Sequence, residues 1–199
     1  MKYNSLIIIP TYNEAENIEL IINKIISIDN SNDVLVVDDN SPDGTSEIVN
    51  NLNNIHDSRV FLIKRDKKSG LGSAYRTGFK WALDNKYSYI FQMDADMSHD
   101  PNEIKNLKIQ LTQNKYDFVI GSRYIEGVSV VNWPLSRIFL SYFANLYVRS
   151  ITCMPVKDAT SGFVGYTKKA LNSIELSEIK FNGYAFQIEM KFKLWKKNF

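Results

Sequence analysis

The chain of 199 residues is 44% hydrophobic and 13% aromatic, which is enough apolar material to fill a core and excludes a disordered chain. Its 24 lysines and arginines nearly balance 22 acidic residues, and the net charge of +2 excludes a protein whose main role is to coat nucleic acid. One cysteine, Cys153, and two histidines, His56 and His99, exclude an intrachain disulfide, a multi-cysteine zinc site and a histidine-rich metal cage.

The N-terminal segment lacks the features of a signal peptide, because its apolar run is short and ends at Pro10. No apolar run reaches the ~18 residues that a membrane span requires. The longest candidate, over 135–151, is interrupted by Arg137 and Arg149. The sequence therefore predicts a location in the reducing cytoplasm.

Strands and helices are predicted to alternate through the first two thirds of the chain. Short apolar runs bounded by turn residues predict strands over 6–9, 34–37, 60–63, 89–93 and 118–120. Apolar residues at helical spacing predict a helix capped by Asn13 and further helices over 45–52, from Gly70 to Leu83 and from Pro101 to about Leu111. This alternation predicts an α/β fold with a mostly parallel sheet covered by helices on both faces.

Polar clusters follow the predicted strands at the points where the strands end. These clusters cover 11–14, 38–45, 94–100 and 121–123. Ligands of parallel α/β sheets bind beyond the carboxyl ends of the strands. The sequence therefore predicts a ligand site at this edge of the sheet.

The last third of the chain has a different pattern. It predicts an irregular loop over 127–133, a helix over 135–151, a strand over 162–166 and a helix over 186–195. The helix over 135–151 has an apolar stripe made of Leu135, Ile138, Phe139, Tyr142, Phe143 and Leu146, and a polar stripe made of Arg137, Ser141 and Asn145. The apolar stripe favours a helix that faces the core, and contact with lipid chains is the second interpretation.

Two carboxylates, Asp94 and Asp96, directly follow the predicted strand over 89–93. Such a pair can converge on one divalent cation, and its oxygen-rich neighbourhood suits Mg²⁺ or Mn²⁺. Because Mg²⁺ usually takes further ligands from substrate phosphates, the pair indicates a diphosphate-containing substrate. The alternative is an acidic turn without a metal, since short motifs often occur by chance.

Asp38 and Asp39 end the predicted strand over 34–37, where a carboxylate can accept hydrogen bonds from a base or a ribose. The same segment also fits an Asx turn in which Gly44 takes a positive φ. Segment 69–72, SGLG, can present backbone N–H groups to phosphate, but a simple helix start is its commoner explanation.

Arginine is scarce, with six residues against 18 lysines. Arg123 follows a strand and Arg137 lies in the polar stripe, and a guanidinium can bind phosphate bidentately. Ser141, one turn beyond Arg137, can add a hydroxyl donor, and surface salt bridges are the alternative for both arginines. His99 is predicted to cap the following helix, and Cys153 to be a small buried side chain.

Seven segments together resemble the inverting GT-A glycosyltransferases of family 2, in particular dolichol-phosphate mannose synthases and their bacterial polyprenol-phosphate relatives. The segments are 10–14 (PTYNE), 37–45 (VDDNSPDGT), 94–99 (DADMSH), 121–124 (GSRY), 132–137 (NWPLSR), 158–163 (DATSGF) and 183–189 (GYAFQIE). The resemblance extends from Ser5 to about Glu189 and is specific in its order and spacing. It implies a GT-A, Rossmann-like fold.

The resemblance also implies roles for individual residues. The residues implied to bind the donor are Pro10, Tyr12, Glu14, Val37, Asp39, Asp94, Ala95, Asp96 and Arg123. The metal is implied to bind Asp96 and, less directly, Ser98, and the acceptor phosphate to bind Arg137 and Ser141. Asp96, Arg123 and Arg137 are the implied catalytic residues.

The implied reaction transfers a sugar to a polyprenyl or dolichyl phosphate at the cytoplasmic face of a membrane, with Mg²⁺ or Mn²⁺ as the cofactor. The usual donor of the family is GDP-mannose, but bacterial relatives also use UDP-glucose, and these motifs do not select the base. A phosphate monoester has a second pKa of about 6 and is already an anionic nucleophile near pH 7. The protein would therefore align the reactants and neutralise charge rather than supply a strong base. Nucleic acid is not an expected partner, and the sequence does not predict the oligomeric state.

We expect one catalytic domain over 1–199, with a nucleotide-binding part over about 1–124 and an acceptor part over about 125–199. In the family, the segment that matches 186–189 is followed by a strand and a basic motif that contacts the donor phosphates. This chain ends at Phe199, so we expect a domain shortened at its C-terminus.

Three alternatives stay open. A family 2 transferase could use a different sugar or a polysaccharide acceptor, and a shortened domain could bind nucleotide without turnover. Phospho-receiver modules also carry paired aspartates after an apolar strand, but there the pair follows the first strand, whereas Asp38 and Asp39 follow the second.

Overall fold

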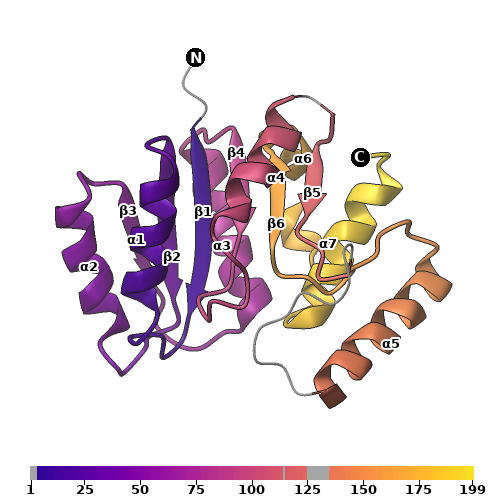
Figure 1. Cartoon of the computed structure of the whole chain (residues 1–199), viewed down its shortest axis with the longest axis horizontal. Coiled ribbons are helices and arrows are strands. Elements are labelled where there is room, and N and C mark those ends of the chain that lie inside the picture. Colours follow the sequence, from indigo (N-terminus) through magenta and orange to yellow (C-terminus); the bar gives the residue numbers. More distant parts are fainter. Residues whose placement is uncertain (1–3, 114, 125–134) are drawn as a thin grey trace.

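The protein forms an α/β sandwich around one six-stranded sheet (Figure 1). The computed structural model describes residues 4–113, 115–124 and 135–199, apart from the side chains of Leu135 and Arg137. The loop predicted over 127–133 lies outside these ranges. The strands are β1 (Ser5–Thr11), β2 (Asn32–Asp38), β3 (Val60–Lys64), β4 (Tyr89–Gln92), β5 (Phe118–Ile120) and β6 (Val164–Thr167), in the order β3-β2-β1-β4-β6-β5.

The direction of the strands decides which residues meet at one edge. β1 pairs in parallel with β2 and β4, and β2 pairs in parallel with β3. β6 is antiparallel to both β4 and β5, so β5 runs in the same direction as the first four strands. The carboxyl ends of β1 to β5 therefore share one edge with the residues that precede β6. The predicted α/β fold with a mostly parallel sheet is confirmed.

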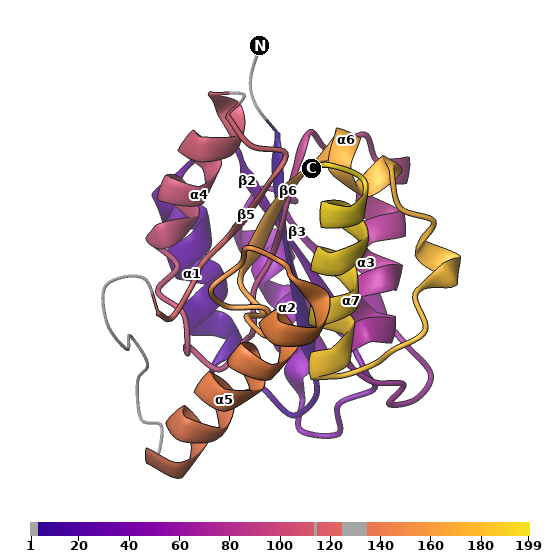
Figure 2. The ribbon, with the colours of Figure 1, turned by 90° about the vertical axis from the view of Figure 1, so that its right-hand side faces the viewer.

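Helices cover both faces of the sheet (Figure 2). One face packs against α1 (Ile18–Ile28), α2 (Thr45–Ile55) and α4 (Glu103–Thr112), and the other against α3 (Leu71–Asp84), α6 (Lys168–Asn172) and α7 (Tyr184–Lys196). In β1, Ile7 and Ile9 belong to the first core, and Leu6 and Ile8 belong to the second. A strand buried on both faces needs apolar side chains in both directions, which explains the continuous apolar run.

Helix α5 (Leu135–Thr152) extends away from this sandwich (Figure 2). Its exposed large apolar side chains are Phe139, Leu140, Tyr142, Phe143, Leu146, Tyr147 and Ile151. The interpretation of a core-facing apolar stripe is therefore wrong. Two residues of the polar stripe contact the protein instead, because the buried Asn145 amide oxygen accepts from the Ala159 N–H and the Ser141 hydroxyl accepts from the Tyr124 hydroxyl. Within the described ranges, no helix combines the length and the apolar character needed to span a bilayer.

Some local predictions differ from the structure. α1 begins at Ile18 after Asn17, and Asn13 takes a φ of 62° while its N–H donates to the Ser41 hydroxyl, so Asn13 does not cap the helix. Cys153 directly follows the end of α5 and is exposed, so the prediction of a small buried side chain is wrong. Two short elements, α6 and a 3-10 helix over Leu176–Glu178, were not predicted.

Candidate active site

A cavity of about 280 Å³ opens at the carboxyl edge of the sheet. Its walls come from β1, β4, the loop before β6 and the start of α7, and its lining residues are Pro10, Glu14, Leu71, Asp94, Ala95, Asp96, Ser98, His99, Arg123, Thr160, Gly162, Gly183, Tyr184 and Gln187. We call this the acidic cavity. It brings together seven of the predicted site residues, namely Pro10, Glu14, Asp94, Ala95, Asp96, Ser98 and Arg123.

Asp94 is held tightly at the end of β4. The Tyr75 hydroxyl donates to its Oδ1 at 3.2 Å, and Gly162 packs so closely that a Cβ there would lie 2.7 Å from Oδ2. Burial, together with the charge of Asp96, raises the pKa of Asp94 to about 6. The two carboxylates therefore repel each other, and a cation between them would relieve this repulsion.

Asp96 is exposed, and its Oδ1 accepts a hydrogen bond from the Ser98 N–H at 3.0 Å. Both predicted metal ligands therefore lie in one short turn. Across the described ranges, no cluster of three or more His, Cys, Asp or Glu side chains could enclose a metal. This donor set fits a Mg²⁺-like ion, which needs only one or two carboxylates and takes other ligands from phosphates and water.

Arg123 lies between β5 and the loop before β6, and it forms a buried ion pair. Its Nε and Nη2 donate to the two oxygens of Asp158 at 2.7 and 2.6 Å, and Nη2 also donates to the Thr160 hydroxyl at 2.7 Å. Burial alone would raise the pKa of Asp158, but the hydrogen bond and charge of Arg123 lower it instead. The surface-salt-bridge alternative is wrong for Arg123, because Asp158 is fully buried.

Lys191 supports the same loop from α7. Its ammonium group is fully buried and donates to the carbonyls of Ala159 and Ser161 at 3.0 and 2.8 Å. Burial lowers its pKa to about 7. Lys191 was not predicted, because it is one of three lysines in α7 and carries no local signal that a loop of another segment will supply its partners.

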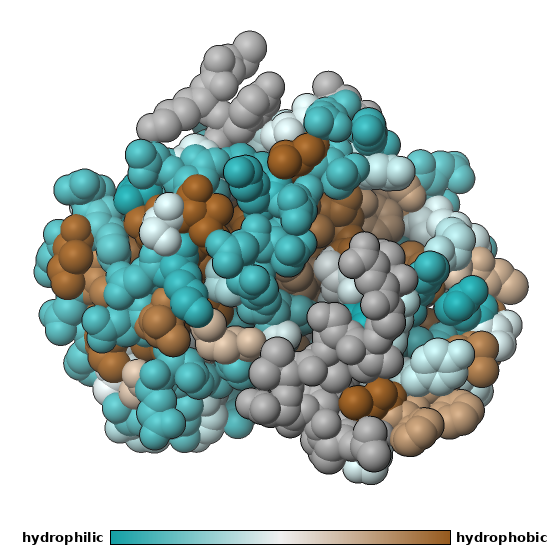
Figure 3. All heavy atoms as spheres, in the orientation of Figure 1, coloured by the Kyte–Doolittle hydropathy of each residue, from teal (hydrophilic) through white to brown (hydrophobic). Residues whose placement is uncertain are grey.

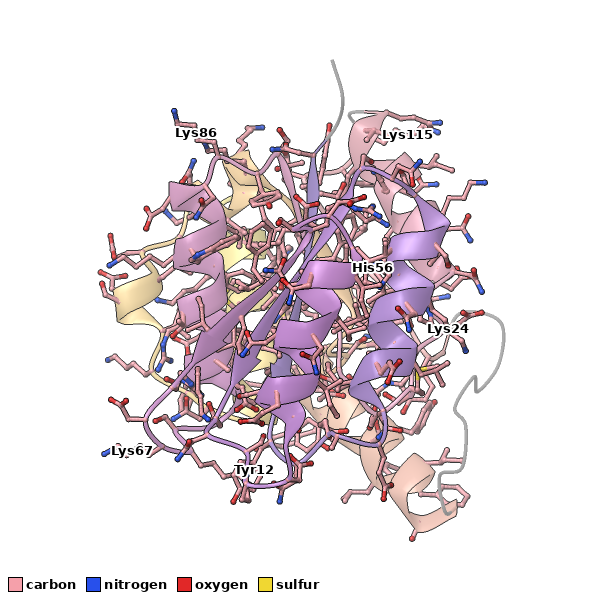
Figure 4. The ribbon with its side chains drawn as sticks, turned by 90° about the vertical axis from the view of Figure 1, so that its left-hand side faces the viewer. Tyr12, Lys24, His56, Lys67, Lys86 and Lys115 are labelled. Carbon is pink, nitrogen blue, oxygen red and sulfur yellow. The ribbon has the colours of Figure 1, made fainter. Side chains whose placement is uncertain are left out.

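The neighbouring edge at β1 and β2 carries three more of the predicted residues. Asp39 binds the Arg65 guanidinium and the N–H groups of Ser69 and Gly70, and Tyr12 is exposed beneath the Lys68 ammonium at 3.7 Å. Figure 4 shows Tyr12 and Lys67 at this same end of the sheet. Val37 is fully buried and supports the edge from within the core.

The alternatives for the turn segments are confirmed. Segment 38–45 contains an Asx turn, held by Asp43 rather than by Asp38 or Asn40, in which the Asp43 carboxylate accepts from the Thr45 N–H at 3.1 Å, and Gly44 has a φ of 90°. Gly70, also at a φ of 90°, precedes the first turn of α3. The predicted cap at His99 is wrong, because its ring stacks on Phe163 and is largely buried, which lowers the pKa of His99 to about 4.

A second cavity of about 340 Å³ adjoins the acidic cavity. Its lining residues are Arg123, Leu140, Ser141, Ala144, Thr160, Tyr184 and Ile188, and we call it the apolar cavity. Arg123, Thr160 and Tyr184 line both cavities. Ser141 lies in the apolar cavity and accepts a hydrogen bond from the Tyr124 hydroxyl at 2.7 Å. The Arg137 side chain is outside the described part of the chain, although its backbone belongs to α5.

The sheet order and the carboxylate-lined edge define an α/β protein with the GT-A fold. The solved structure of glucosyl-3-phosphoglycerate synthase from Mycobacterium tuberculosis with Mn²⁺, UDP and glucosyl-3-phosphoglycerate matches it with a TM-score of 0.63, at 19% identity, over 94% of this chain and 63% of that one. The chain belongs to glycosyl transferase family 2, whose family model, described as "Glycosyl transferase family 2", matches residues 6–175.

Three curated proteins are more similar to this chain in sequence than that solved structure is. Polyprenol monophosphomannose synthase of Mycolicibacterium smegmatis is 41% identical over 95% of this chain and 71% of its own length. Undecaprenyl-phosphate mannosyltransferase of Micrococcus luteus is 40% identical over 94% of this chain and 76% of its own length. Dolichol-phosphate mannosyltransferase of Pyrococcus furiosus is 39% identical over 88% of this chain and 49% of its own length.

Proposed function

We propose that this family 2 glycosyltransferase moves a sugar, mannose from GDP-mannose, to a polyprenyl phosphate in a reaction that depends on Mg²⁺ or Mn²⁺. The observation that carries the proposal is the junction of an acidic cavity with an apolar cavity at Arg123, Thr160 and Tyr184. A nucleotide sugar and a metal match the first cavity, and an isoprenyl chain matches the second. The names of the three relatives favour mannose as the sugar.

The donor would lie along the sheet edge from β2 to β4. Asp39, Tyr12 and the end of β1 would contact the nucleoside, with Pro10 and Glu14 leading into the acidic cavity. Asp96 would hold the cation with Asp94 beside it, and the bound cation would neutralise the departing nucleoside diphosphate. Ser98 already binds Asp96 through its N–H, so we assign it to orienting that carboxylate.

The acceptor phosphate would meet the donor where the two cavities join. Arg123 lines this junction, and Ser141 lies on the inward face of α5, where its hydroxyl can donate to a phosphate while it accepts from Tyr124. Arg137, one turn earlier in α5, would add a second guanidinium. An acceptor phosphate oxygen would then attack the anomeric carbon as the bond from that carbon to the donor phosphate breaks.

This arrangement needs alignment more than a strong base. A phosphate monoester is largely dianionic near pH 7, since its second pKa is about 6. Placing it beside a diphosphate brings two negatively charged groups together, and the arginines and the cation would offset their repulsion. We accordingly assign donor binding to residues up to about 124 and acceptor binding mainly to residues 125–199, within one catalytic domain.

A membrane surface is the proposed place of the acceptor. The exposed apolar side chains of α5 form a surface beside the mouth of the apolar cavity, and hydrophobic residues are visible at this end of the molecule (Figure 3). A polyprenyl chain held in a bilayer would reach the cavity if α5 lay against the interface at the cytoplasmic face.

A donor and acceptor screen tests the proposal. Purified protein is incubated with Mg²⁺ or Mn²⁺, a short-chain polyprenyl phosphate and either GDP-mannose or UDP-glucose, and the glycolipid is detected by mass spectrometry. We expect a sugar phosphate ester of the polyprenol with GDP-mannose and a metal. The matched control is the same polyprenol without its phosphate, and equal transfer to this alcohol would refute the acceptor assignment.

A binding measurement tests the metal assignment separately. We expect Asp96→Ala to abolish the metal-dependent part of nucleotide-sugar binding in isothermal titration calorimetry, with Asp100→Ala, an exposed neighbour, as the control. Unchanged binding by Asp96→Ala with and without metal would remove Asp96 from the metal site.

A further inference from the structure

Gln187 is a buried polar residue for which folding alone gives no reason. It lies on α7, is 1% exposed and lines the acidic cavity. Both polar atoms of its side-chain amide, Nε2 and Oε1, are buried and have no hydrogen-bond partner among the described residues. Its buried neighbours on α7 are the apolar Phe186, Met190 and Leu194 and the ammonium-bearing Lys191, which donates to the carbonyls of Ala159 and Ser161. A methionine would fit the same space without leaving a donor and an acceptor unsatisfied.

The chemistry of a carboxamide restricts the ligand that it can pair with. Nε2 donates hydrogen bonds and Oε1 accepts them, so the best partner is a group that does both. A phosphate oxygen would satisfy only Nε2, a metal cation would satisfy only Oε1, and an isoprenyl chain would satisfy neither. A hydroxyl group both donates and accepts, so the unsatisfied amide matches a sugar hydroxyl.

The position of Gln187 along the cavity agrees with this match. The strand order places the residues after β1 first, those after β4 next and the loop before β6 beyond them. Pro10 and Glu14 thus lie toward β1, whereas Gly162 lies at the β6 end, beyond Asp94. Thr160, from the same loop as Gly162, also lines the apolar cavity. A donor whose nucleoside lies toward β2 and whose diphosphate lies near Asp96 therefore places its sugar toward this loop and the start of α7.

We infer that Gln187 is a specificity-determining residue whose amide binds a hydroxyl group of the transferred sugar. This inference rests on the proposed function, which supplies the nucleotide sugar. Under this inference, α7 recognises the sugar, the carboxylates after β4 face the diphosphate, and the β1–β2 edge faces the nucleoside.

Titration calorimetry of Gln187→Met tests the inference, with GDP, UDP, GDP-mannose and UDP-glucose as ligands in the presence of Mg²⁺. We expect the affinity for the nucleotide sugar to fall about tenfold to a hundredfold, as for the loss of a buried hydrogen bond, while the affinity for the nucleoside diphosphate stays within about twofold. The melting temperature of the ligand-free variant should not fall, because the methionine removes an unsatisfied amide. Gln113→Met, an exposed glutamine at the end of α4, is the matched control.

Donors that lack one sugar hydroxyl at a time give a second test, and its wild-type measurements do not depend on how the variant folds. One deoxy donor should bind the wild-type protein at least tenfold more weakly than the parent sugar, and Gln187→Met should not discriminate against that donor. Equal binding of the parent sugar to Gln187→Met and wild type would overturn the inference and leave the proposed function standing. A wild-type protein that binds none of the four nucleotides would overturn both.

Discussion

Strand β1 and helix α5 are both rich in large apolar residues, yet they have opposite environments. Leu6, Ile7, Ile8 and Ile9 are completely buried, whereas the seven large apolar side chains of α5 are 49% to 73% exposed. In β1 the apolar side chains pack against helices on both faces of the sheet. In α5 they are exposed together on one helix, and clustered exposed apolar side chains are typical of an interaction site. A high apolar content therefore builds the core in one region and an exposed apolar surface in the other.

The inward face of α5 shows why the helix stays attached without an apolar contact stripe. Asn145 is buried and binds the backbone N–H of Ala159, and its amide also reaches Asp158 at 3.4 Å. Asp158 in turn holds Arg123 at the end of the sheet region. A polar network thus joins α5 to the protein directly beside the acidic cavity, and the large apolar side chains of α5 remain exposed.

The same substitution made in the core that β1 shares with α3 and on the exposed face of α5 tests the comparison most directly. Phe79→Ala, in the core of α3, should lower the free energy of unfolding by about 3–5 kcal/mol, because it removes a fully buried ring. Phe143→Ala, on the exposed face of α5, should change it by no more than about 0.5 kcal/mol. Urea denaturation followed by circular dichroism measures both. A large loss for Phe143→Ala would mean that α5 is stabilised by its apolar face after all.

A substitution in the polar network that joins α5 to the protein should also lower the free energy of unfolding. Asp158→Ala leaves the buried Arg123 guanidinium without its carboxylate partner, and we expect a loss of about 3 kcal/mol in the free energy of unfolding. Glu178→Ala is the matched control, because its carboxylate lies 3.7 Å from Lys193 and is mostly exposed, so its loss should change stability by less than about 1 kcal/mol. If both variants changed the free energy of unfolding by similarly small amounts in urea denaturation, the polar network would not stabilise the fold.

The sequence sufficed for most of the fold, because local patterns determine most of its elements. The β-branched run at Ile7 to Ile9 predicts a strand buried on both faces, and the Asp94–Asp96 pair follows such a strand. The orientation of α5 was predicted wrongly for a physical reason. Spacing shows that a helix has an apolar and a polar stripe, but only long-range partners, here the bonds of Asn145 to 158–159, decide which stripe faces the protein.

The candidate site residues were predictable where they follow strand ends, whereas segments 158–163 and 183–189 matched the family without a role being assigned to any of their residues. Gln187 and Lys191 lie within a helical pattern that gives no hint of what they face. Thr160 enters the site because β6 runs antiparallel to β4, which brings the start of β6 to the edge where the other strands end. Strand direction depends on pairing between distant segments, and the apolar pattern of a short strand does not encode it.

The buried Lys191 ammonium predicts a pH dependence of stability. Its pKa is about 7 in the folded protein and near the ordinary 10.5 when unfolded, so above pH 7 the unfolded state binds more protons. The burial penalty is therefore fully present below pH 7 and declines as the pH rises toward 10.5. Asp158, Arg123 and Asp94 are the charged groups that act on Lys191.

The measurement compares the free energies of unfolding of wild type and Lys191→Met as the pH changes. Between pH 7 and 9, the wild type should gain about 2 kcal/mol relative to the variant, at ~1.4 kcal/mol per pH unit above the folded pKa. Lys193→Met, two positions along α7 and partly exposed, is the control and should leave the wild-type slope unchanged. A difference between wild type and Lys191→Met that is constant with pH would contradict the lowered pKa of Lys191.

A smaller change in stability is expected of Ser141→Ala, on the inward face of α5. This variant distinguishes acceptor binding by that face from its role in holding α5 on the protein. Ser141→Ala removes one neutral hydroxyl from the apolar cavity and leaves the polar network at Asn145 intact, so stability should change by less than about 1 kcal/mol. If Ser141 binds the acceptor phosphate, the KM for a short-chain polyprenyl phosphate should rise by about threefold to tenfold while the KM for the donor is unchanged. Ser150→Ala, an exposed serine on the same helix, should alter neither KM. Equal KM values for Ser141→Ala and wild type would restrict the role of this face to holding α5 on the protein, and acceptor binding would then depend on the arginines alone.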